Sequence, residues 1–140
     1  MLWLRKSKKG FTLIELMVVV AIIGVLALLG LRLYTGQQDK AKNAIVKANA
    51  GTIQTLIQAE LADRPVTELD ATTELTTIVF ANAGIFNPVT GAAQAACPAD
   101  EATAAAGEVW VTYSTNVFTI NGRNTGDDDN VYDNSLTARK

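Results

Sequence analysis

The chain is 140 residues long, 49% hydrophobic, and carries a formal net charge of −2. This length allows one small domain in addition to a hydrophobic segment. The charges are unevenly divided, because the first ten residues are strongly basic and residues 65–140 are predominantly acidic. An acidic region does not suit a phosphate backbone, so no direct nucleic-acid binding is indicated.

The composition also argues against an enzyme. The chain has no histidine, which removes the commonest general base and the commonest zinc ligand. No Gly-rich phosphate loop and no catalytic triad can be assembled from its residues. The single cysteine, Cys97, allows no intramolecular disulfide, and we interpret it as a small buried hydrophobic residue or an idle thiol rather than a nucleophile. We expect no catalytic activity and, apart from a calcium ion considered below, no cofactor.

Residues 1–10, MLWLRKSKKG, form a short basic leader that ends directly against an apolar run. The positive-inside rule places this leader in the cytoplasm and the rest of the chain beyond the membrane. An ordinary secretory signal is the alternative, because small residues at positions 21, 24, 27 and 30 mimic the cleavage site that follows the apolar part of such a signal.

The apolar run from Phe11 to Leu31 would be about 31 Å long as a helix, enough to cross a bilayer core of about 30 Å. It contains one charge, Glu15, and the next is Arg32, which we expect at the outer membrane interface. A carboxylate at the centre of such a helix costs on the order of 2.5–3.5 kcal/mol, so Glu15 is a candidate functional residue. The alternative is an acid tolerated because interfacial water is close.

A cut between Gly10 and Phe11 would give Glu15 a partner. The new α-amine of Phe11 would be a cation at pH 7, with an ordinary pKa of about 8. Glu15 lies four residues on, so it faces the same side of the helix. The two charges can then neutralise each other, within one chain or between neighbouring chains. A pair between chains would fix the height of one subunit against the next.

The segment KGFTLIELMVVVAIIG, with the basic leader before it, resembles the processing and assembly signature of type IV pilins and of the related pseudopilins. The resemblance is dense over residues 8–24 and fair to about Ala62. It implies that a membrane prepilin peptidase cuts after Gly10 and methylates Phe11, and that Glu15 is the assembly glutamate. The chain departs from the family in two ways. It has Arg32 where the family usually has a helix-kinking proline, and it lacks a disulfide.

The resemblance also implies partners and a location. Before assembly, the precursor would be embedded in the lipid of the inner membrane with its head outside. An inner-membrane assembly platform would then add it to a helical homo-oligomer, an extracellular pilus that serves adhesion, motility or DNA uptake. Two alternatives stay open, a pseudopilin of type II secretion and a single-span membrane-anchored binding module.

Helical character continues to Asp63, and the Arg64-Pro65 pair then ends it. From Gln38 onward the pattern is amphipathic with two adjoining apolar faces, so we expect one face on the protein's own sheet and the other on neighbouring subunits. A helix buried within a single domain is the alternative. We expect Ile45, Ile53 and Leu56 to face the sheet. The faces are Ala41, Ile45, Ala48, Leu56 and Ala59, and Val46, Ala50, Ile53, Ile57 and Leu61.

Residues 64–140 are expected to form a globular head. Alternating patterns predict a tight hairpin of strands over 108–114 and 116–121, and a third short strand at 131–133. Residues 72–80 fit a short helix or strand, 101–106 a helical turn and 82–88 a loop. A long helix on a small antiparallel sheet is an α+β fold, which the resemblance also implies. The predicted divisions are the leader 1–10, the transmembrane or filament-core half-helix 11–37, the amphipathic half-helix 38–63 and the head 64–140.

A group of carboxylates near the carboxy terminus suggests a calcium site. Asp127, Asp128, Asp129 and Asp133 lie close together in the sequence, and calcium takes six to eight oxygen ligands. Their spacing is not that of an EF-hand, and a solvated acidic turn is the alternative. Bound calcium here would favour a secretion pseudopilin.

Overall fold

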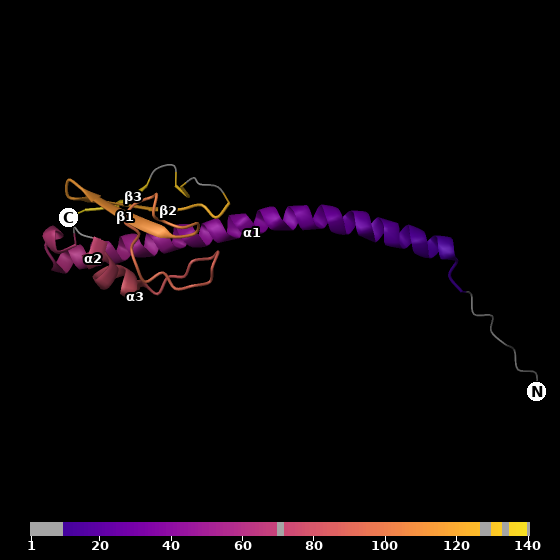
Figure 1. The fold of residues 1–140 in the computed structure, drawn as a ribbon, viewed down its shortest axis with the longest axis horizontal. Coiled ribbons are helices and arrows are strands. Elements are labelled where there is room, and N and C mark those ends of the chain that lie inside the picture. Colours follow the sequence, from indigo (N-terminus) through magenta and orange to yellow (C-terminus); the bar gives the residue numbers. More distant parts are fainter. Residues whose placement is uncertain (1–9, 70–71, 127–129, 133–134, 140) are drawn as a thin grey trace, which may run out of the picture. The chain divides into compact units, whose positions relative to one another are not determined.

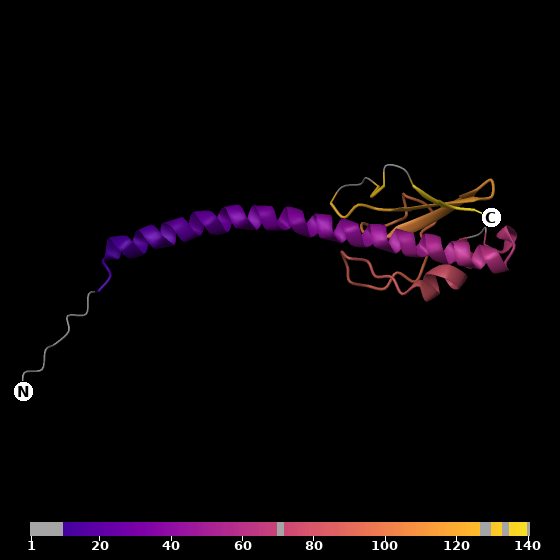
Figure 2. The ribbon, with the colours of Figure 1, turned by 180° about the vertical axis from the view of Figure 1, so that it is seen from behind.

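The computed structural model describes residues 10–69, 72–126, 130–132 and 135–139 (Figures 1 and 2). The chain forms two compact units that meet between Gln37 and Gln38. The elements in chain order are α1 (Leu13–Asp63), the 3₁₀ turn η1 (Val66–Glu68), α2 (Thr72–Glu74), the π-helical turn η2 (Leu75–Phe80), α3 (Ala81–Ala83), and the strands β1 (Val109–Ser114), β2 (Val117–Gly122) and β3 (Leu136–Ala138).

In the first unit, the described residues are dominated by the apolar part of α1. The large hydrophobic side chains of residues 11–34 are all exposed, from 52% at Val18 to 90% at Phe11. By length and composition, α1 is the one helix in the described part of the chain that is apolar enough to cross a membrane. So large an exposed apolar surface requires cover by lipid or by another protein surface.

The second unit packs the later part of α1 against an antiparallel sheet of order β1-β2-β3 (Figure 1). Val109 and Val111 of β1 and Phe118 and Ile120 of β2 are at most 2% exposed and share one core with the helix. The predicted α+β fold is therefore confirmed. The helix contributes Val46, Ala50, Ile53, Ile57 and Leu61 to that core.

The buried face of α1 is one of the two apolar faces that the sequence predicts, and its residues recur every three or four positions. Ile53 lies at its centre with no exposed surface, and Leu56 packs against its margin. The assignment of Ile45 to the sheet side is wrong, because its side chain is 48% exposed. Successive helix residues point about 100° apart, and the neighbouring Val46 takes the buried position.

Residues 72–83 form a single helical segment made of α2, η2 and α3. The first two residues of the loop expected at 82–88 therefore belong to a helix. The segment ends at Gly84, whose φ of 61° is the left-handed conformation that glycine adopts at helix ends. The helical turn expected at 101–106 is present as one turn, in which Ala104 N–H donates to Asp100 O at 3.2 Å.

The predicted hairpin is confirmed, with a two-residue turn of Thr115 and Asn116 between β1 and β2. Both turn residues have positive φ, 53° and 64°, as a type I′ turn requires. The Tyr113 hydroxyl donates to Asn116 Oδ1 at 2.9 Å and braces this turn. Strand β2 begins at Val117, one residue later than predicted, because Asn116 is used by the turn.

The prediction of a third strand at 131–133 is wrong. Val131 and Tyr132 lie outside the strands, and β3 forms at 136–138 with Leu136 opposite Ile120. Tyr132 instead contacts α1, where its hydroxyl donates to Lys47 O at 3.0 Å. The Lys47 Nζ atom lies 5.5 Å from the centroid of the Tyr132 ring.

Two further side chains of α1 hold the carboxy-terminal segment. Asn43 Oδ1 accepts hydrogen bonds from the N–H and the hydroxyl of Thr125, at 2.9 and 2.8 Å. Gln54 Nε2 donates to Thr137 O at 2.8 Å. Together with the hydrogen bond of Tyr132, these contacts connect pairs of residues that are separated by 82 to 85 positions in the sequence. Polar contacts and packing therefore hold this segment, which no intramolecular disulfide can do.

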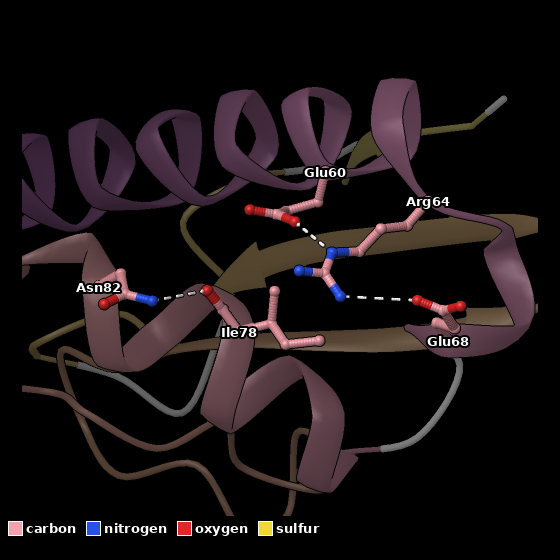
Figure 3. A network of polar contacts seen from close by, with 5 residues as sticks. All are labelled: Glu60, Arg64, Glu68, Ile78 and Asn82. Carbon is pink, nitrogen blue, oxygen red and sulfur yellow. Dashed lines mark hydrogen bonds and ion pairs between the residues drawn. The ribbon is translucent and has the colours of Figure 1, made fainter.

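The carboxy-terminal end of α1 carries a small ionic network (Figure 3). Arg64 Nε lies 2.9 Å from Glu60 Oε2, and Arg64 Nη1 lies 3.5 Å from Glu68 Oε2. Nearby, Asn82 Nδ2 donates to Ile78 O at 3.0 Å. These ion pairs are exposed and contribute little to stability.

A chain that begins at Gln38 is expected to be a folded, soluble and weakly associating monomer. It keeps the whole of the second unit, including the helix face that fills the core. Circular dichroism and sedimentation would measure its fold and association. If it stays unfolded while the full-length protein is folded in detergent, the first half of α1 belongs to the head's core.

Gly122→Ala is expected to lower the free energy of unfolding by about 1–3 kcal/mol, the usual range for overpacking. An added Cβ would overlap Val46 Cγ1 and lie 3.2 Å from Val131 Cγ2. Gly51→Ala is the control, because its Cβ would meet nothing within 4 Å. The buried Trp110 is the only tryptophan after Gln38, so its fluorescence reports unfolding. Equal melting temperatures for Gly122→Ala and wild type would contradict this close approach.

Candidate functional site

The start of α1 is closed by a reciprocal pair of side chains, Thr12 and Glu15. The N–H and the hydroxyl of Thr12 donate to Glu15 Oε2 at 2.8 and 2.7 Å. Glu15 N–H donates back to Thr12 Oγ1 at 3.3 Å. Because Leu13 is the first helical residue, Thr12 occupies the N-cap and the pair forms a capping box.

The capping box gives Glu15 a local role that our sequence analysis missed. A threonine followed three residues later by glutamate, directly before an apolar run, is a sequence signal for this motif. In apolar surroundings an unpaired backbone N–H is costly, and the box satisfies such groups at the helix start. The negative charge also lies at the end of the helix where the macrodipole favours it.

The two oxygens of Glu15 are used differently. Both Thr12 donors bind Oε2, while Oε1 takes no hydrogen bond from any residue that the structure describes. The side chain is exposed. One oxygen therefore holds the carboxylate at a fixed place on the helix, and the other is available to a second donor.

Gly10 and Phe11 precede the first turn of α1, and both are exposed. A Cβ added at Gly10 would meet no atom within 4 Å, so the fold of this chain does not itself require glycine there. The structure brings Glu15 to Thr12, and no hydrogen bond joins Phe11 and Glu15 among the described residues. In the uncut chain, the Phe11 nitrogen is an amide rather than the charged amine that cleavage would produce.

The other candidate groups are the calcium ligands and Cys97, and neither forms a reactive or metal-binding site among the described residues. Asp127, Asp128, Asp129 and Asp133 lie outside those residues, and no cluster of metal-binding side chains occurs within them. Cys97 is buried, as predicted, and burial raises its thiol pKa to about 11. Such a thiol stays protonated at pH 7 and is a poor nucleophile.

Two kinds of comparison connect this site to known proteins. A family model described as the prokaryotic N-terminal methylation motif matches residues 5–31, a range that includes Gly10, Phe11 and the whole capping box. No solved structure shows a significant match to the chain.

Curated fimbrial proteins and pilins are similar to part of the chain. Fimbrial protein EcpB of Eikenella corrodens is 42% identical over 64 residues, which cover 46% of this chain and 40% of that protein. The type IV major fimbrial protein FimA of Dichelobacter nodosus is 40% identical over 60 residues, covering 43% and 38%. The type IV major alpha-pilin of Moraxella bovis is 42% identical over 55 residues, covering 39% and 35%. The chain thus spans about two fifths of the length of the curated relatives it matches.

Proposed function

We propose that this chain, which matches the prokaryotic N-terminal methylation motif and is similar to type IV fimbrial proteins, is the structural subunit of a type IV pilus-like filament. One observation carries the proposal. The carboxylate of Glu15 is fixed at the start of an exposed apolar helix, and its Oε1 accepts no hydrogen bond from the described residues. Glu15 lies four residues after Phe11, within the segment that matches the methylation motif.

Processing would take place at the Gly10–Phe11 junction. Both residues are exposed and precede the helix, so a peptidase at the membrane surface reaches the peptide bond without unwinding α1. Cleavage converts the Phe11 amide into an α-amine, and methylation leaves this amine a cation at pH 7. The mature chain then begins with a positive charge one turn before Glu15.

Assembly would pair that amine with Glu15 of a neighbouring subunit. Oε2 of Glu15 stays on Thr12, and Oε1 accepts the neighbour's N–H. A buried pair of this kind is tolerated because each charge neutralises the other. The exposed apolar side chains of residues 11–34 would lose their lipid and pack on the same segments of other copies.

The proposal also places the protein in two locations. The precursor is a single-pass protein of the inner membrane with its head outside, and the prepilin peptidase and the assembly platform act on it there. The polymer is extracellular and serves adhesion, motility or DNA uptake. The acidic head lies outside the membrane in both states.

Fibres sheared from the cell surface would test the proposal. We expect long filaments in which this chain is the main protein. If the chain instead stays in the membrane fraction, and its loss blocks the release of secreted proteins, it is a secretion pseudopilin. If it remains a monomer with an uncut leader, it is a membrane-anchored module and the proposed function is wrong.

A further inference from the structure

The second unit exposes three large hydrophobic side chains. Among the described residues of the second unit, these are Ile45 at 48%, Phe86 at 57% and Val89 at 45%. Single exposed hydrophobic residues are common on protein surfaces and need no explanation. Several gathered at one place indicate an interaction surface.

One contact brings the loop that carries Phe86 and Val89 to the part of α1 that carries Ile45. Asn49 Nδ2 donates to Phe86 O at 2.9 Å, which ties the loop after α3 to α1. Ile45 lies one turn before Asn49, on the same side of the helix. Figure 1 shows this loop running beside α1.

The loop is held firmly. Asn87 is 3% exposed, and its Oδ1 accepts a hydrogen bond from Val89 N–H at 2.7 Å. Its Nδ2 donates to Ala106 O at 3.0 Å. Phe86 also pairs with Ala93 in a short antiparallel bridge. The patch is therefore preformed and loses little conformational freedom on binding.

Short, uncharged side chains border Ile45 on one side, while Lys42, three residues before it, is half-buried on the other. Ala41, Ala48 and Thr52 lie within about two turns of Ile45 on its side of α1, and all three are exposed. Short side chains allow the backbone of a partner to approach closely.

We propose that Ile45, Phe86 and Val89 form a docking surface for a second copy of this chain. The surface would contact the apolar part of that copy's α1, between Leu13 and Tyr34. This rests on the proposed function, because that helix surface needs a protein cover only after a subunit leaves the lipid. The two surfaces match in chemistry, since the helix carries no charge between Glu15 and Arg32.

Thiol labelling of the full-length chain tests the docking surface. Val89→Cys places a thiol in the patch, and Ala95→Cys is the control at an exposed position outside it. The wild-type chain gives the background, since its Cys97 is buried. A bulky, membrane-impermeant maleimide is applied to each variant in phospholipid vesicles and in purified filaments. We expect the labelling of Val89→Cys, relative to that of Ala95→Cys, to fall at least about tenfold on assembly, because a docked interface excludes such a reagent.

Three results would overturn the proposal in distinguishable ways. An unchanged ratio in intact filaments means that the patch stays open, while the proposed function survives. A ratio already low in vesicles means that lipid covers the patch. Failure of the wild-type chain to form filaments removes the proposed function and the docking surface with it. As a second readout, Phe86→Ser should lower filament yield by roughly tenfold through lost apolar burial, and an unchanged yield would contradict docking.

Discussion

Glu15→Ala is expected to abolish filaments while the precursor accumulates normally in the membrane. Removing one partner of a buried ion pair costs about 3–5 kcal/mol, which weakens subunit addition at least about a hundredfold. Membrane insertion should improve, because the helix loses a charge. Leader cleavage should be largely intact. Immunoblots of membrane and sheared fractions measure these effects, and a wild-type yield of filaments would show that the carboxylate is a bystander.

Glu15→Gln separates the two roles of this side chain. Glutamine at this position still completes a capping box with Thr12, but it cannot neutralise an incoming amine. If the charge pair drives assembly, Glu15→Gln fails as Glu15→Ala does. If it assembles fully, the helix cap was the contribution that mattered and the charge pair is wrong. Glu15→Asp should be intermediate, because the charge remains on a shorter side chain.

Gly10→Val is expected to leave uncut, full-length precursor in the membrane. The fold tolerates a side chain at this position, since an added Cβ meets nothing within 4 Å. The defect would therefore arise at the peptidase, where a branched side chain next to the scissile bond blocks access. Gly10→Ala is the matched control and should be cut more readily. The mobility of the chain on a gel reports cleavage, and normal maturation of Gly10→Val would refute the assigned junction.

The elements that could be predicted from sequence are those with a long or unambiguous local pattern. The long helix has no proline before Pro65, and it ends at Asp63 as expected. The hairpin follows from two alternating runs separated by a short turn. In each case the residues that decide the structure are neighbours in the chain.

The errors arise where contacts between distant residues decide. Tyr132 has the apolar character of a strand residue, but its hydroxyl and ring bind Lys47, 85 positions earlier. The strand that pairs with β2 is therefore the following segment, 136–138. Likewise, the helical pattern alone does not show which of the adjoining residues Ile45 and Val46 meets the sheet.

The candidate site was only half predicted from the sequence. The charge of Glu15 and its distance from the Gly10–Phe11 junction indicate both, and the family model also matches this part of the chain. The spacing of Thr12 and Glu15 already predicts a capping box, but the charge-pair hypothesis for Glu15 did not include this role. The way Glu15 divides its two oxygens required the structure.

The amino terminus of the protein in purified filaments tests the central claim most directly. Sequencing and intact mass should show a chain that begins at Phe11 with one added methyl group, and no trace of residues 1–10. Filament protein that begins at Met1, or at a residue beyond the apolar run as after a secretory signal, would contradict the assignment of this segment.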